Sequence, residues 1–125
     1  MNKLDLWQEV PDKLRSEWYR IFSNDNEGIF MKDMCPVCNT QNLHCYYQVY
    51  RNIKRRIDGI LYIGSGAKWE WCSKCKTYEH SSSLVPEWWN LEVLADLDNL
   101  TLEPKVLDDL IIKIKNKDVK TRTLR

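Results

Sequence analysis

The sequence of 125 residues contains few of the residues that mark extreme classes of protein. It has only four glycines and four prolines, which excludes collagen-like and low-complexity chains. Its longest apolar runs, at 59–64 and 110–112, are far shorter than the roughly 20 residues that span a bilayer. The first ten residues lack the apolar stretch of a secretory signal. We therefore expect a cytoplasmic globular protein with no membrane partner, whose length suits a single domain over residues 1–125.

Residue patterns of common catalytic sites are also missing from the sequence. The chain has only two histidines, and it lacks the nucleophile-elbow, phosphate-loop and zinc-protease motifs. Asp108 and Asp109 are neighbours on an expected helix, so they do not face each other as a catalytic carboxylate pair would. No small-molecule substrate is indicated. We therefore expect a protein that is not an enzyme.

Cysteine, in contrast, is frequent and regularly spaced. Cys35 and Cys38 form one C-x-x-C pair, and Cys72 and Cys75 form a second. Two such pairs supply the four thiolates of a tetrahedral Zn²⁺ site, which has no open coordination position. The sequence therefore predicts one structural zinc ion. The fifth cysteine, Cys45, lies on the apolar face of an expected strand and is predicted to be a buried thiol.

Other uses of the same residues are open at the level of sequence. A dithiol redox site places one C-x-x-C pair at the start of a helix, and neither pair precedes an expected helix. The same four thiolates are also able to ligate an iron–sulfur cluster. His44 or His80 could replace one thiolate, although four cysteines at this spacing complete a site without them.

The order of these motifs resembles a zinc ribbon. Cys-Pro-Val-Cys, a stretch of expected strands and Trp-Cys-Ser-Lys-Cys together cover residues 35–80. The resemblance implies an antiparallel sheet with the metal at one end. It implies no single function, because ribbons bind nucleic acids, assist enzymes and contact other proteins. The segment between the pairs is longer than in the shortest ribbons, which leaves the order of the strands open.

Periodicity predicts a three-stranded meander between the two pairs. Alternating apolar residues predict a strand over 43–50. Asp58-Gly59 predicts a hairpin turn that leads into a strand over 60–63. Gly64-Ser65-Gly66 predicts a second turn before a strand over 67–72, in which Trp69 and Trp71 point inward.

Helices are expected on both sides of this meander. An apolar stripe with helical spacing predicts a helix over 11–22. A second stripe predicts a C-terminal helical part over 91–116, followed by a basic tail over 117–125. The sequence thus predicts an α+β fold, with a zinc-ribbon-like antiparallel β-sheet flanked by N-terminal and C-terminal α-helices.

Positive charge is concentrated next to the expected hairpin turn, although the net charge is only +1. The cluster comprises Arg51, Lys54, Arg55 and Arg56. These cations could contact phosphates while Tyr46, Tyr50 and Tyr62 stack on bases, which makes a nucleic-acid-binding ribbon one candidate function. The alternative is a charged edge that discourages pairing with other strands.

Negative charge is concentrated closer to the C-terminus. Residues 81–112 carry seven acidic residues and one lysine, and they include two adjacent tryptophans, one of which we expect near the surface. An acidic surface with an aromatic anchor suits a cationic protein partner. The predicted partner-binding residues are Glu87, Trp88, Trp89, Glu92, Asp96 and Asp98. In size and charge pattern the chain loosely resembles bacterial immunity proteins, and this resemblance implies a zinc-stabilised protein that neutralises a cationic, nuclease-like toxin.

Overall fold

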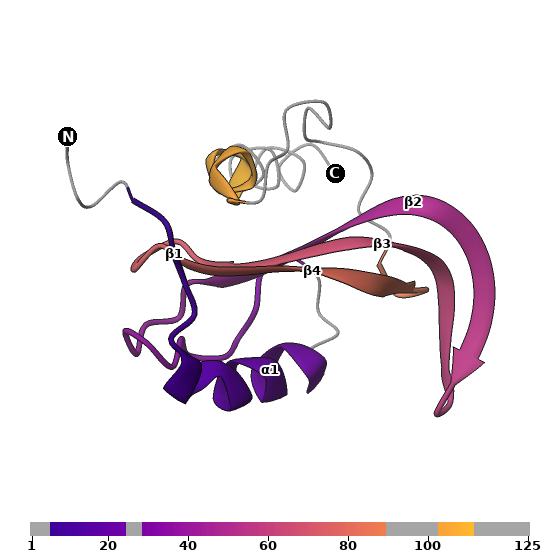
Figure 1. The fold of residues 1–125 in the computed structure, drawn as a ribbon, viewed down its shortest axis with the longest axis horizontal. Helices are drawn as coiled ribbons and strands as arrows, with labels where there is room; N and C mark the ends of the chain where they lie inside the picture. Colours follow the sequence, from indigo (N-terminus) through magenta and orange to yellow (C-terminus); the bar gives the residue numbers. More distant parts are fainter. Residues whose placement is uncertain (1–5, 25–28, 90–102, 112–125) are drawn as a thin grey trace, which may run out of the picture.

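The computed structural model describes residues 6–24, 29–89 and 103–111. A four-stranded mixed sheet with the strand order β1-β4-β3-β2 forms its centre. Helix α1 covers one face of the sheet, and a short C-terminal helix at 105–111 covers the other (Figure 1). The α+β class is therefore confirmed. The elements are β1 (Gln8–Glu9), the 3-10 turn η2 (Asp12–Leu14), α1 (Arg15–Asn24), β2 (Leu43–Ile57), β3 (Ile60–Cys72) and β4 (Thr77–Pro86).

The sheet is mixed because its first strand runs parallel to its neighbour. β1 pairs with β4 in parallel, at Gln8↔Thr77 and Glu9↔Tyr78. β2, β3 and β4 pair in the antiparallel manner that the zinc-ribbon resemblance implied. The sequence did not predict β1, because a strand of two residues is too short to produce a periodic signal.

The N-terminal helix begins as a 3-10 turn before it becomes α-helical. Pro11 precedes η2, and α1 extends to Asn24, slightly beyond the end expected at residue 22. Trp18 and Phe22 are buried, and their rings lie 5.0 Å apart because residues four apart share one helix face. In the described part of the chain, no helix is both long enough and apolar enough to pass through a membrane.

β2 and β3 form one long hairpin instead of the predicted three-strand meander. Asp58 and Gly59 both have positive φ, at 51° and 84°, and join the two strands in the predicted tight turn. The second predicted turn, at 64–66, is wrong, because β3 continues without a break through these residues. The third antiparallel strand is β4, which follows the hairpin. Its serine-rich sequence carries no strand signal.

Gly64 and Gly66 lie at a bend in β3, where β2 approaches closely, and they do not form a turn. A Cβ atom on Gly66 would overlap the carbonyl oxygen of Gln48, and one on Gly64 would lie 2.8 Å from Cγ1 of Val49. The pairing of β2 with β3 shifts register between Val49 and Arg51 and again between Asn52 and Arg55. Such bulges bend a hairpin, and the far end of this one curls over toward the α1 side of the sheet (Figure 1).

Both faces of the sheet are buried near its middle. Trp69 and Trp71 point inward as predicted, on the face that carries the C-terminal helix. Lys68 and Glu70 alternate with them on the α1 face and are buried as well. β3 alternates charged and aromatic residues over 68–71, and it is nevertheless covered on both faces there.

We expect Gly66→Ala to destabilise the protein strongly. Its new Cβ would meet backbone, which cannot move as a flexible side chain does, so the loss in free energy of unfolding should be about 3 kcal/mol or more. Gly59→Ala is the control, since its Cβ meets nothing within 4 Å and costs only about 1 kcal/mol for the positive φ. Urea denaturation measures both. Equal losses in the two variants would contradict this account of the bend.

Candidate metal centre

The structure brings together the four cysteines that the sequence singled out. The Sγ atoms of Cys35, Cys38, Cys72 and Cys75 all lie within 4.8 Å of one another. Cys35 Sγ is 3.8 Å from Cys75 Sγ, and Cys38 Sγ is 3.7 Å from Cys72 Sγ. Both separations are far longer than the roughly 2.05 Å of a disulfide bond, and all four cysteines are free thiols.

These separations fit one tetrahedrally coordinated ion. A regular tetrahedron with metal–sulfur bonds of about 2.3 Å has sulfur–sulfur edges of about 3.8 Å. The two measured separations, 3.8 and 3.7 Å, match that edge. Four soft sulfur donors at the corners of such a tetrahedron suggest a zinc site.

The two C-x-x-C turns share one local geometry. In the first, the amide of Asn39 donates to the carbonyl of Cys35 at 2.8 Å, and φ of Asn39 is 59°. In the second, the amide of Lys76 donates to the carbonyl of Cys72 at 3.0 Å, and φ of Lys76 is 62°. Each turn therefore closes on the residue after its second cysteine. A dithiol redox site lies at the start of a helix. Neither of these turns is followed by a helix.

Two threonines complete this repeat and were missed in the sequence. The hydroxyl of Thr40 lies 3.0 Å from Cys38 Sγ, and that of Thr77 lies 3.1 Å from Cys75 Sγ. Both threonines follow their cysteine by two positions, so the true repeat is C-x-x-C-x-T. A hydroxyl that donates to a metal-bound thiolate orients the ligand and offsets part of its charge. The repetition of this pattern at 35–40 and 72–77 was the sequence signal that could have identified the two threonines.

Crowding of the sulfurs perturbs their protonation. Hydrogen bonds from Cys35 and Cys72, assisted by Thr77, lower the pKa of Cys75 to about 2. Hydrogen bonds with Cys72 and Cys75, together with burial, raise the pKa of Cys35 well above its usual value. Four thiolates this close together repel one another, and a divalent cation supplies the charge that allows all four to ionise together.

The second turn also holds the C-terminal helix through Asp108. Oδ1 of Asp108 accepts hydrogen bonds from Trp71 Nε1 at 3.0 Å and from Ser73 Oγ at 2.6 Å. Oδ2 pairs with Lys76 Nζ at 3.0 Å. Ser73 lies within the Cys72–Cys75 turn, and Lys76 comes directly after it. The same few residues therefore carry the candidate metal ligands and the contact with the helix.

Lys76 connects the same turn to the N-terminal segment. Its ammonium lies 4.8 Å from the centre of the Trp7 ring, a cation–π contact. Its carbonyl accepts a hydrogen bond from the amide of Gln8 at 2.9 Å, which starts the pairing of β1 with β4. The described N-terminal and C-terminal segments therefore both attach next to the cysteine cluster.

The remaining candidate ligands lie outside the cluster. Nδ1 of His44 is 3.2 Å from the carbonyl oxygen of Ile29, and its ring contacts those of Phe30 and Trp71. The ring of His80 lies 4.7 Å from that of Trp69, and burial lowers the pKa of His80. Cys45 is only 5% exposed, in agreement with the predicted buried thiol.

The four cations predicted to bind nucleic acid lie on the curled half of the β2–β3 hairpin, residues 48–63. Arg51, Lys54, Arg55 and Arg56 are exposed there. Tyr50 is 64% exposed beside them, whereas Tyr46 is buried in the core and is not available for stacking on a base. Tyr62 is half-buried.

The predicted partner-binding residues are only partly within the described chain. Glu87 is exposed, and Trp88 is half-buried with its ring 5.9 Å from that of Tyr47. Trp89 is buried and contacts Tyr46, so Trp88 is the tryptophan nearer the surface. Glu92, Asp96 and Asp98 lie outside the described residues, as does the basic tail over 117–125.

A buried ion pair beneath α1 was not foreseen. Lys68 Nζ lies 2.9 Å from Glu70 Oε2, and Trp18 Nε1 donates to Glu70 Oε1 at 3.1 Å. Burial lowers the pKa of Lys68, but the charge and hydrogen bond of Glu70, together with the charges of Cys45 and Tyr47, outweigh burial and raise that pKa. Opposite charges two residues apart on a strand share a face, which was the signal available in the sequence.

Comparison with protein-family models, with curated proteins and with solved structures finds no match to this chain. The function proposed for the protein therefore depends on its own geometry and chemistry.

We expect Asp108→Asn to loosen the C-terminal helix. The substitution removes the charge that three donors share, which should lower the free energy of unfolding by about 2 kcal/mol. Hydrogen exchange at residues 103–111 should rise. Asp109→Asn, on the exposed side of the same helix, should change the stability by less than about 0.5 kcal/mol. If the two variants behaved alike, the proposed attachment through Asp108 would be wrong.

Proposed function

We propose that this protein is a non-enzymatic, zinc-stabilised binding protein. The observation that supports the zinc is the arrangement of the four sulfurs, whose separations of 3.7 and 3.8 Å match the edges of a ZnS₄ tetrahedron. All four coordination positions are then filled by the protein, so no position is left for the water or substrate that a catalytic zinc needs. The ion would have a structural role.

The position of the cluster supports the same role. Cys72 is the last residue of β3, and Cys75 lies two residues before β4. The first turn is attached to the second, because the amide of Ser73 donates to the carbonyl of Asn42 at 2.9 Å next to the start of β2. One ion would therefore fix the same end of all three antiparallel strands.

Removing one ligand tests this role. In small zinc domains the binding of the ion contributes on the order of 10 kcal/mol to folding, so Cys72→Ser should lose its zinc and most of its stability. Native mass spectrometry and thermal unfolding measure both effects. Cys45→Ser is the matched control, since it removes the cysteine outside the cluster and should keep one zinc per chain. Visible absorption with iron in place of zinc would refute the assignment.

We infer that the binding surface is the curled half of the β2–β3 hairpin and that its ligand is nucleic acid. Residues 48–63 carry four cations and a single acid, Asp58. The four cations are exposed, and Tyr50 offers a ring beside them. Cations that neutralise phosphates together with a ring that stacks on bases form the usual surface for single-stranded nucleic acid.

The salt dependence of binding tests this surface. Each phosphate contact to a single strand contributes about −0.7 to the slope of log affinity against log salt. Arg55→Glu combined with Arg56→Glu should therefore flatten the slope by about 1.4 and weaken binding at least tenfold. The measurement is fluorescence anisotropy with a labelled single-stranded oligonucleotide.

A second double variant controls for net charge. Lys13→Glu combined with Arg20→Glu makes the same change in charge at exposed positions on η2 and α1, away from the hairpin. It should bind nearly as the native chain does. Equal weakening in both double variants, or binding that ignores salt, would rule out the hairpin as the nucleic-acid surface.

A cationic protein partner for the acidic segment over 87–98 stays a prediction, as does the cytoplasmic location. Of the described partner-binding residues, Glu87 is exposed and Trp88 is half-buried, which is compatible with such a surface.

A further inference from the structure

We propose that the groove between α1 and the outer edge of β4 binds an extended, uncharged peptide segment, which adds to the sheet as a further strand. The site is separate from the cationic residues of the hairpin, and it does not depend on the nucleic-acid proposal. Four features of the described chain support it: the shape of the groove, the unpaired edge of β4, the polarity of the walls and the pairing of the charges inside.

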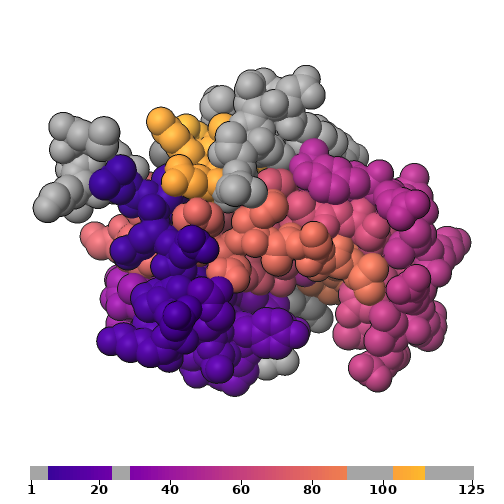
Figure 2. Space-filling view, viewed as in Figure 1, coloured from indigo at the N-terminus to yellow at the C-terminus, as the bar shows by residue number. Residues whose placement is uncertain are grey.

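The groove has a volume of about 1160 Å³ and is lined by α1, by the middle of the sheet and by the curled end of the hairpin. Figure 2 shows it as the hollow between the indigo α1 and the pink end of the hairpin, below the orange β4. The hairpin forms its far wall because of the bend at Gly64 and Gly66. An extended chain of several residues fits a space of this size.

The edge of β4 beside the groove offers backbone groups for pairing. The carbonyls of Lys76 and Tyr78 accept hydrogen bonds from β1 and the residue after it, at 2.9 and 3.2 Å. Backbone groups alternate in direction along a strand, so those of His80, Ser82 and Leu84 point to the same side. Of these, the carbonyl of Leu84 already accepts one hydrogen bond, from Ser83 Oγ at 2.8 Å. Within the described residues, β1 pairs with this edge only at Thr77 and Tyr78, and no strand pairs with it further along.

The first strand ends where the proposed peptide would begin. The amide of Val10 donates to the carbonyl of Tyr78, and Pro11 then turns the chain below the sheet into η2. Natural sheets usually protect such an edge with lysine, proline or a bulge. The sequence from Glu79 to Val85 contains no lysine or proline, and its pairing with β3 shows no register shift before Gly64↔Val85. An unprotected edge of this kind is the usual template for strand addition.

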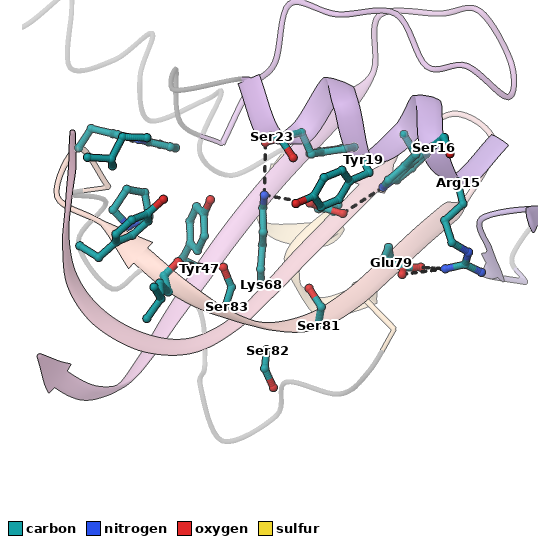
Figure 3. A pocket seen from close by; sticks show the side chains of 18 of the residues that line it. Arg15, Ser16, Tyr19, Ser23, Tyr47, Lys68, Glu79, Ser81, Ser82 and Ser83 are labelled. Carbon is teal, nitrogen blue, oxygen red and sulfur yellow. Dashed lines mark hydrogen bonds and ion pairs between the residues drawn. The ribbon is translucent and has the colours of Figure 1, made fainter. Parts of the chain in front are cut away.

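Hydroxyl groups line both long walls of the groove. Ser16, Tyr19 and Ser23 lie on one face of α1, since they are spaced by three and four residues. Figure 3 shows Ser81 and Ser83 of β4 pointing toward α1, while Ser82 points away. Alternate side chains of an added strand would enter the groove between these two rows, where small or hydroxyl-bearing side chains find hydrogen-bonding partners.

The charges inside the groove are already paired. Lys68 is 2.9 Å from Glu70, and Arg15 is 2.9 Å from Glu79 (Figure 3). A charged ligand that took one of these groups as its partner would have to break the existing pair, which is costly for the buried Lys68–Glu70 pair. The groove therefore favours an uncharged segment over a phosphate chain or a basic tail.

The end of the groove nearest the hairpin is aromatic. Tyr47, Tyr62 and Trp88 line it, and the rings of Tyr47 and Trp88 lie 5.9 Å apart. Such an end accepts an apolar or aromatic side chain, whose burial supplies specificity. The preferred segment is thus an extended, uncharged sequence with small polar residues and one apolar or aromatic side chain.

Selection from a library of short random peptides displayed on phage tests the proposal. The bait is the full chain loaded with zinc, and selected peptides are synthesised for titration calorimetry. We expect uncharged, β-prone peptides. Ser82→Pro removes one outward amide from the edge without touching the pairing with β3, and it should weaken their binding at least tenfold. Ser82→Ala keeps the amide and should bind as the native chain does.

Two further measurements keep the test decisive if Ser82→Pro does not fold. Tyr19→Ala changes a side chain that is 73% exposed on the helix wall, and it should weaken the same peptides severalfold. In NMR spectra, the amides of His80, Ser82 and Leu84 should shift on titration. Zinc content, measured in parallel, separates failure of this proposal from failure of the zinc assignment.

Several results would overturn the proposal. These are no enrichment of any peptide, selection of highly charged peptides, and binding that Ser82→Pro and Tyr19→Ala leave unchanged. Sedimentation that shows self-association broken by Ser82→Pro would also overturn it, because the edge would then be occupied by a second copy of the chain.

Discussion

The requirement that four sulfurs lie within 4.8 Å of one another determines how one end of this molecule is built. It places the end of β3 and the start of β4 beside the turn that precedes β2. Lys76, next to Cys75, then contacts both Trp7 and Asp108, so the attachments of the N-terminal strand and the C-terminal helix depend on the same turn. A change in the metal centre therefore reaches both the N-terminal strand and the C-terminal helix through a single residue. This is a stronger coupling than the sequence distance between Trp7 and Asp108 would indicate.

Burial of both faces of the sheet creates a second constraint beneath α1. Lys68 and Glu70 are taken out of water there, and an unpaired charge in such a place costs several kcal/mol. Their contact at 2.9 Å, the indole donor from Trp18 and the carbonyl of Phe22 near the ammonium satisfy most of their hydrogen-bonding groups. Because two of these partners come from α1, the pair also sets how the helix lies on the sheet.

The parts of the structure that could be predicted from sequence are those determined by local chemistry. Cysteines at fixed spacing, the Asp58-Gly59 turn and the apolar stripe of α1 each act over a few residues. β4 could not be predicted in this way, because Ser81, Ser82 and Ser83 become a strand only through pairing with β3. Gly64-Ser65-Gly66 was misread as a turn for a related reason. Its glycines are needed because strand β2 approaches them closely, and local sequence does not reveal this approach. Thr40 and Thr77, by contrast, were visible as a repeat.

The bend in the long hairpin connects the two proposed binding surfaces. β2 and β3 continue well beyond the part of the sheet that α1 covers, and the close approach at Gly66 with the two register shifts turns their far end over the α1 face. The exposed cations of this end lie on both of its faces, because Arg55 pairs with Tyr62 and Arg56 pairs with Leu61. Ile60 and Tyr62 form the far wall of the groove beside β4. A straight hairpin would keep the cations but open the groove, since Ile60 and Tyr62 would no longer lie opposite α1. Gly66 thus affects the shape of the groove directly, whereas the zinc-binding cysteines lie at the other end of the hairpin from the far wall of the groove.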